Sequence, residues 1–365
     1  MKPFELFAVV QPGLEKYAIE EFQGLGIKYN EVENGGISFV GHLTTLFKVN
    51  IQARCISRVL LRIGKFHADT FWQLEKGLAK LPWDDFISIQ DICIRSTSIA
   101  SNLYHEKAIT ERCINTLNQH YGKPIRVQSS PDALNTQLIL IQVEHDQVTV
   151  SIDSSGAHLH KRGYMKMRSP APIRETIAAG LIKASGWMES DRELLDPMCG
   201  SGTIPIEAAV MACNFPLSQY RNFAFQKWGI FNKDLFKRVN DEAGEQIHPM
   251  KKGLIHASDI SEEMVKIAIQ NAKAARVEEY IDFSVLPAHK WHKPLARYQV
   301  ITNPPYGKRI SNQTRISLQQ IFEAMQANGS IVDLFIPLEE VGKWYIRKLH
   351  FSCKNGGIPI QAIRI

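Results

Sequence analysis

The chain has 365 residues, a length that fits two or three domains better than a single core. Hydrophobic residues make up 44% and charged residues 22%, as in soluble globular proteins. No apolar run is long enough to span a bilayer, and the amino terminus lacks a signal-peptide pattern. We therefore expect a cytoplasmic protein with no membrane partner. The net charge of +6 permits a polyanionic partner but does not identify one.

The first half of the chain alternates short β-like runs with helical segments. Helices are predicted over 14–25 and 107–120, and His145 to Gln147 form a turn between two alternating runs, as in a hairpin. The predicted strands are 5–10, 36–40, 58–63, 89–96, 137–144 and 147–153. This pattern indicates small α+β modules rather than a doubly wound sheet.

A basic connector follows, between residues 154 and 168. It contains Lys161, Arg162, Lys166 and Arg168 and no acidic residue after Asp153. A charge run of this kind can be merely solvated. Because Gly163 and Tyr164 lie among these cations, we predict instead that all four contact the phosphate of a substrate.

From Pro172 onward, β and α segments alternate. Pro172 is predicted to open a helix that runs to Ser185 and stops at Gly186. Later helices are predicted over 203–213, 261–275 and 315–328, with strands over 193–195, 254–257, 281–286, 299–302 and 331–336 and a final hairpin turning at 354–357. The pattern predicts one mostly parallel sheet with an antiparallel carboxyl-terminal hairpin.

A glycine-rich loop, Asp196 to Thr203, follows the first strand of this second half. A dinucleotide fingerprint would place a third glycine where the chain has Pro205, and a phosphate-binding P-loop would need a Lys-Ser/Thr pair that is absent after Gly202. An ordinary loop is the remaining alternative. Two glycines nevertheless allow the main chain to approach a ligand, so we predict a cofactor site at the carboxyl end of this strand.

S-adenosylmethionine fits the acids around this loop. Asp196 can hold an ammonium group, and Asp259, which ends the next strand, can accept both hydroxyls of a ribose. The predicted cofactor-binding residues are Pro172, Thr176, Asp196, Met198, Gly200, Gly202, Thr203, Asp259, Ile260 and Ala288.

A second motif, Asn303-Pro304-Pro305-Tyr306, follows a later buried strand. An exocyclic amine on a base is a poor nucleophile. Accepting both its N–H bonds, with the Asn303 side chain and a proline carbonyl, would direct its lone pair toward a methyl donor, and Tyr306 can stack on a base turned out of its helix. The alternative is a plain proline-rich turn. Lys308 and Arg309 are predicted to contact substrate phosphate.

Metal and disulfide sites are not predicted. The six cysteines are scattered without a C-x-x-C pair, which indicates reduced, mostly buried thiols. The pairs His158/His160 and His289/His292 have no accompanying set of cysteine or carboxylate ligands.

The chain resembles the THUMP-domain-containing class I RNA methyltransferases, which include bacterial large-subunit rRNA guanine-N2 enzymes and related tRNA enzymes. The resemblance rests on segments 11–15, 154–156, 160–164, 171–179, 196–203, 221–225 and 303–306 and covers nearly the whole chain. It implies an α/β fold with a Rossmann-like methyltransferase domain over 171–365, preceded by a ferredoxin-like domain over 1–55, a THUMP RNA-binding domain over 56–156 and a basic linker over 157–170.

The resemblance and the two loops together predict an S-adenosylmethionine-dependent RNA guanine-N2 methyltransferase that acts on 23S rRNA. Three alternatives stay open. They are a tRNA guanine-N2 methyltransferase, a DNA adenine-N6 methyltransferase, since the chemistry of residues 303–306 suits either amine, and an RNA-binding protein that has lost catalysis.

Overall fold

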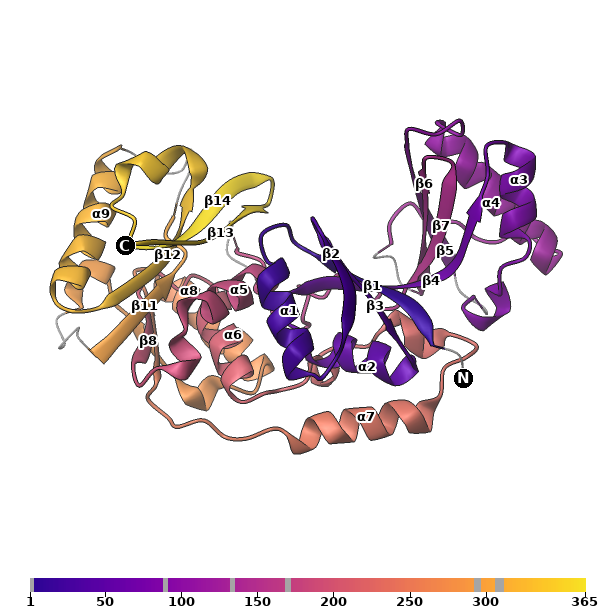
Figure 1. The fold of residues 1–365 in the computed structure, drawn as a ribbon. Helices are drawn as coiled ribbons and strands as arrows, with labels where there is room; N and C mark the ends of the chain where they lie inside the picture. The colour runs from indigo at the N-terminus through magenta and orange to yellow at the C-terminus, as the bar shows by residue number, and fades with distance from the viewer. Residues whose placement is uncertain (1–2, 88–90, 132–134, 168–171, 292–296, 306–311) are drawn as a thin grey trace.

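The computed structural model describes residues 3–87, 91–131, 135–167, 172–291, 297–305 and 312–365. In these parts of the chain, each half forms a seven-stranded sheet. Figure 1 shows the N-terminal half on the right and the C-terminal half on the left, with helix α7 (Lys233–Glu245) running beneath them. Among the described helices, none is both long and apolar enough to cross a lipid bilayer.

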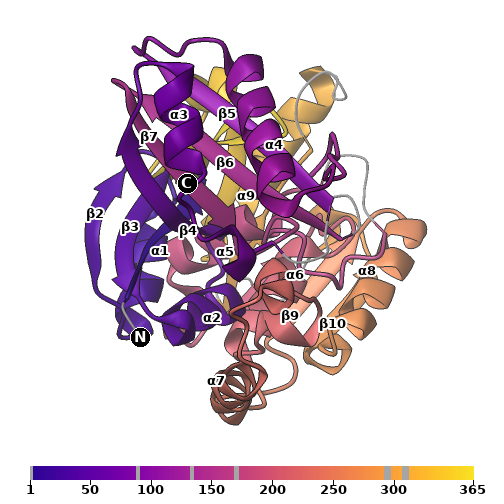
Figure 2. The ribbon, with the colours of Figure 1, turned by 90° about the vertical axis from the view of Figure 1, so that its right-hand side faces the viewer.

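The N-terminal half is one mixed sheet with helices packed against it. Its strands are β1 (Phe4–Val10), β2 (Tyr29–Glu33), β3 (Gly36–Gly41), β4 (Ile56–His67), β5 (Asp91–Ile99), β6 (Thr136–Glu144) and β7 (Gln147–Asp153), and its helices are α1 (Glu15–Gly24), α2 (Leu43–Gln52), α3 (Phe71–Leu78) and α4 (Glu106–Tyr121). The strand order is β2-β3-β1-β4-β7-β6-β5. Figure 2 shows α3 and α4 in front of the β5–β7 part of this sheet.

Strand β4 joins the two predicted N-terminal domains. It pairs with β1 on one side and with β7 on the other, both antiparallel. The predicted boundary at residue 55 therefore falls directly before a strand that both parts share. The predicted hairpin at His145 and Asp146 joins β6 to β7, and both residues have positive φ, of 48° and 60°.

The C-terminal half is the predicted mostly parallel sheet. Its strands are β8 (Glu193–Asp196), β9 (Ile255–Asp259), β10 (Ile281–Val285), β11 (Tyr298–Thr302), β12 (Ile331–Pro337), β13 (Lys348–Asn355) and β14 (Ile358–Arg364), and its other helices are α5 (Glu175–Ser185), α6 (Thr203–Ala212), α8 (Glu262–Ala274) and α9 (Asn312–Ala327). The order is β10-β9-β8-β11-β12-β14-β13, in which the first five strands are parallel. The antiparallel hairpin β13–β14 completes the sheet, as predicted.

The helix predicted to begin at Pro172 begins three residues later. Helix α5 starts at Glu175, and Arg174 before it is extended, with φ −69° and ψ 139°. The Pro172 carbonyl accepts a hydrogen bond from the Asn355 side chain at 3.4 Å, so it is engaged by the β13–β14 hairpin. The predicted end is confirmed, because Gly186 caps the helix in the left-handed conformation at φ 67°.

The two halves meet where α1 approaches the edge strand β13. Tyr17 and Phe351 pack edge to face with ring centroids 5.6 Å apart. Gly13, just before α1, has φ +96°, and a Cβ at this position would lie only 2.0 Å from the Ser352 carbonyl oxygen. Only glycine allows this approach of two backbones. The six cysteines are free and buried, as predicted.

A buried ion pair ties the connector to both halves. Arg162 donates to both carboxylate oxygens of Glu207 on α6, at 3.1 and 3.0 Å, and to the Arg54 carbonyl oxygen at 2.8 Å. Tyr164 donates its hydroxyl to the same carboxylate. Burial alone would lower the pKa of Arg162, but the Glu207 charge outweighs it and raises this pKa above its usual value. The pair is therefore charged and fully enclosed.

Removal of Arg162 should destabilise the whole chain. An Arg162→Met variant leaves the Glu207 charge buried without its partner, which costs about 3 to 5 kcal/mol of unfolding free energy. Urea unfolding followed by tryptophan fluorescence measures this loss. Lys166→Met, at an exposed position of the same segment, serves as control and should shift stability by about 0.5 kcal/mol at most. Equal stability of the two variants would contradict a buried ion pair between Arg162 and Glu207.

Candidate active site

The two sequence motifs lie side by side at one edge of the C-terminal sheet. β8 and β11 are neighbouring parallel strands, with Leu195 opposite Val300, so their carboxyl ends emerge together. The hydroxyl of Thr302, the last residue of β11, donates to Asp196 Oδ1 at 2.7 Å. The motifs therefore meet where open α/β sheets place their ligands, as their positions in the sequence predicted.

The glycine loop is held against β9 by its own backbone. The Cys199 amide donates to the Ser258 carbonyl at 2.9 Å, and the Gly200 amide donates to Asp259 Oδ2 at 3.0 Å. Gly202 has φ +86°, and a Cβ there would come within 3.0 Å of Ala268 Cβ on α8. Both constraints favour glycine at position 202, so the turn of the loop depends on this residue.

The two carboxylate oxygens of Asp259 accept hydrogen bonds from two different backbone amides. Oδ2 accepts the Gly200 amide and Oδ1 accepts the Ser261 amide at 2.9 Å, which fixes the side chain. Each oxygen still has a second lone pair, so the carboxylate can also accept hydroxyl donors from a ligand. Ser261 in turn caps α8 by accepting the Met264 amide, as the sequence predicted.

Asp196 is buried without a cationic partner among the described residues. Its exposed fraction is 1%, and burial raises the pKa of its carboxyl to about 7, with a smaller contribution from the nearby Asp259 charge. The hydrogen bonds from Thr302 and from the Met198 amide oppose the rise but do not cancel it. A cation placed beside this carboxyl would restore its ionised form.

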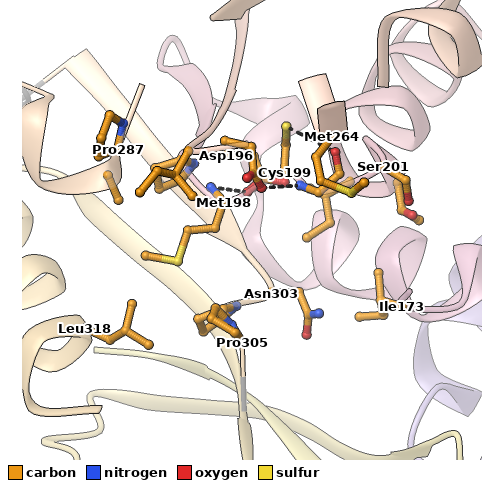
Figure 3. A pocket seen from close by; sticks show the side chains of 18 of the residues that line it. Ile173, Asp196, Met198, Cys199, Ser201, Met264, Pro287, Asn303, Pro305 and Leu318 are labelled. Atoms are coloured by element: carbon orange, nitrogen blue, oxygen red, sulfur yellow. Dashed lines mark hydrogen bonds between the residues drawn. The ribbon is translucent and has the colours of Figure 1, made fainter. Parts of the chain in front are cut away.

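A cavity of about 530 Å³ opens between the two loops. Figure 3 shows Asp196 and Met198 on one side and Asn303 and Pro305 on the other. Most of the predicted cofactor-binding residues line it, namely Pro172, Asp196, Met198, Gly200, Thr203, Asp259, Ile260 and Ala288, together with Asn303, Pro304 and Pro305 of the predicted catalytic motif.

Two predicted cofactor residues do not line this cavity. Thr176 lies on α5 and is buried, with 1% of its surface exposed. Gly202 faces α8, against which it packs, and shapes the loop from behind.

Several cavity residues were not predicted. Leu318 and Ile321 come from α9, Met264 from α8, and His289 follows Ala288. The three-residue spacing of Leu318 and Ile321 fits one apolar face of a helix, which does not by itself indicate a cavity. No local motif distinguishes such residues from ordinary core positions.

Asn303 carries an acceptor that the described structure does not use. Its Oδ1 atom is buried, lies at the cavity and has no hydrogen-bond partner among the described residues. Burying such an atom unpaired costs about 1–3 kcal/mol, so its presence at a cavity points to a donor on a ligand. Tyr306, Lys308 and Arg309, predicted beside it, lie outside the described residues.

The predicted phosphate-contacting role of Arg162 is wrong. Its side chain is fully buried and paired with Glu207, so it cannot reach an RNA backbone. Tyr164 beside it is buried as well. Lys161 and Lys166 are exposed, whereas Arg168 lies outside the described residues.

Comparison with known proteins gives two matches to family models and many relatives. Residues 162–329 match the family model described as "RMKL-like, methyltransferase domain", and residues 5–60 match the model of the "RlmL ferredoxin-like domain". The "Ribosomal RNA large subunit methyltransferase K/L" of Psychromonas ingrahamii is 34% identical over 84% of this chain, which spans only 42% of that protein's length.

Two further relatives match over most of their length. The "Putative RNA methyltransferase YpsC" of Bacillus subtilis is 30% identical, and the match covers 89% of this chain and 84% of that protein. The crystal structure of SMU.472 complexed with SAH superposes with a TM-score of 0.85 at 27% identity, covering 100% of this chain and 98% of that one. YpsC is 30% identical over most of its length, and the two domain models match this chain in order. The chain therefore belongs to the RMKL-like methyltransferase family.

Proposed function

We propose that this chain transfers a methyl group from S-adenosylmethionine to the exocyclic N2 amine of a guanosine in RNA, with 23S rRNA as the substrate. The observation that carries the proposal is the Asn303 oxygen, which has no hydrogen-bond partner among the described residues and lies at a cavity that also contains a buried acid, Asp196. One wall therefore offers an acceptor for an amine, and the other offers a partner for a cation.

The cofactor side of the cavity matches the chemistry of S-adenosylmethionine. Asp196 would bind the ammonium group, and Asp259, with its free lone pairs, would accept the ribose hydroxyls. Ile260 and Ala288 line the same wall and would contact the adenine ring. When bound, the cofactor supplies an activated methyl group, so the protein mainly has to position the acceptor nitrogen.

The acceptor side would hold the base. Asn303 Oδ1 would accept one N–H of the amine and the Pro304 carbonyl the other, which turns the nitrogen lone pair into the cavity. Pro304 is buried and its φ is fixed by its ring, so this carbonyl would need no rearrangement. In the proposal Tyr306 stacks on the flipped base.

The choice of RNA is supported by the relatives and by the connector. The named activity of the Psychromonas protein is on large-subunit rRNA, and that of YpsC is on RNA. Lys161 and Lys166 are exposed on the connector and would contact phosphate, together with Arg168, Lys308 and Arg309. Residues 56–156 would act as the THUMP module that grips structured RNA.

Removal of the Asn303 side chain should abolish most turnover without weakening cofactor binding. An Asn303→Ala variant loses an acceptor that orients the amine, and we expect methyl transfer to fall about 100-fold or more, by analogy with the removal of other preorganised polar groups. Calorimetry with S-adenosylhomocysteine should give wild-type affinity. Asn328→Ala, at an exposed residue directly after the end of α9, is the matched control.

The substrate is identified in the same assay. Purified 23S rRNA, tRNA and duplex DNA are incubated side by side with labelled cofactor, and modified nucleosides are read by mass spectrometry. N2-methylguanosine in 23S rRNA supports the proposal, and its appearance only in tRNA would move the substrate to tRNA. N6-methyladenine in DNA would refute the proposal, and cofactor binding with no transfer would indicate an RNA-binding protein without catalysis.

Cofactor affinity should depend on pH through Asp196. With a carboxyl pKa of about 7, the acid is mostly protonated at pH 6 and mostly ionised at pH 7.5, and an ammonium ligand prefers the ionised form. We therefore expect S-adenosylhomocysteine to bind about five- to tenfold more tightly at pH 7.5 than at pH 6. Asp196→Asn keeps the acceptor for Thr302 but has no charge to titrate, and should bind more weakly with little pH dependence. The same slope in both proteins, measured by calorimetry, would remove Asp196 from the ammonium site.

A further inference from the structure

Asn271 of α8 is a buried side chain whose hydrogen bonds join two separate backbone segments. It is 0% exposed. Its Oδ1 atom accepts the amides of Lys166 and Met167, at 2.9 and 3.3 Å, and its Nδ2 atom donates to the carbonyls of Met167 and Ser201, at 2.8 and 3.0 Å. All four hydrogen-bonding positions of the carboxamide are therefore used.

The first segment joined by Asn271 is the connector. Within residues 161 to 166, Arg162 and Tyr164 are buried against Glu207, whereas Lys161 and Lys166 are exposed. Asn271 binds both the amide and the carbonyl of Met167, so it holds the backbone of the connector just beyond the buried pair. The exposed lysines are thus displayed from a backbone fixed at two helices, α6 and α8.

The second segment is the glycine loop of the cavity. Ser201 lies between Gly200 and Gly202, is 2% exposed and lines the cavity wall. Ala268, three residues before Asn271 on α8, packs against Gly202. Helix α8 therefore contacts the loop at two successive turns, once through packing and once through the Asn271 hydrogen bond.

We propose that Asn271 is a positioning residue through which cofactor binding at the glycine loop stabilises the RNA-binding connector. A displacement of either segment breaks a hydrogen bond in a site enclosed by protein, where a lost partner is not easily replaced by water. A ligand that fixes the loop therefore also restricts the connector, and by thermodynamic linkage a ligand that fixes the connector also stabilises the loop. This inference rests on the proposed function, because it takes the cavity as the cofactor site.

The test uses limited proteolysis of the full chain. Trypsin cuts after lysine only when the connector opens locally, so the rate of cleavage after Lys161 and Lys166, identified by mass spectrometry, reports connector stability. Saturating S-adenosylhomocysteine should slow this cleavage about fivefold or more in the wild-type protein. In Asn271→Asp, which keeps the shape but cannot donate to Ser201 and Met167, the ligand should still bind by calorimetry but should no longer protect the connector.

Two further variants make the result decisive. Gln270→Glu introduces the same chemical change at the neighbouring exposed position and should retain wild-type protection. Asn271→Ala replaces Asn271→Asp if the latter fails to fold. Equal protection in the Asn271 variants and in the wild type, or ligand binding without protection in the wild type, would overturn the coupling. If the wild type does not bind S-adenosylhomocysteine at all, the proposed function itself fails.

Discussion

A single hydrogen bond between two strand ends brings the site together. Thr302 donates to Asp196 at 2.7 Å, across 106 residues of sequence, and joins the loop after β11 to the loop after β8. The parallel register of the two strands makes this contact possible, because both carboxyl ends emerge at the same edge. A slip of one residue would turn Thr302 to the other face of the sheet and would separate the acid from Asn303.

Sequence reasoning predicted this edge well because its signals are local. Short buried runs, turn-forming glycines and prolines, and capping residues such as Ser261 and Gly186 act within a few positions of themselves, and the structure has them where the pattern placed them. The start of α5 was misplaced because the competing interaction is distant. Asn355 binds the carbonyl of Pro172 from 183 residues away, and no local rule reveals it.

The error at Arg162 has a different physical origin. Composition alone grouped it with three other cations, although residues of one short segment can differ completely in burial. Arg162 and Tyr164 share the inward side, and Lys161 and Lys166 lie on the outward side. The carboxylate that holds Arg162 inside the protein, Glu207, belongs to an apolar helix in which it resembles an isolated irregularity. Local sequence patterns do not reveal the distant partners of buried charges.

The site departs from the rules that the rest of the fold obeys. Glu207 is buried with a full set of partners, whereas Asp196 is buried without a cation and Asn303 has an unpaired oxygen among the described residues. Both departures cost folding free energy and both face one cavity, which is the usual sign of a functional site. A cofactor with an ammonium group beside Asp196 and a base with an amine beside Asn303 would together satisfy both. The folding free energy that the two unsatisfied groups cost is then recovered when the ligands bind.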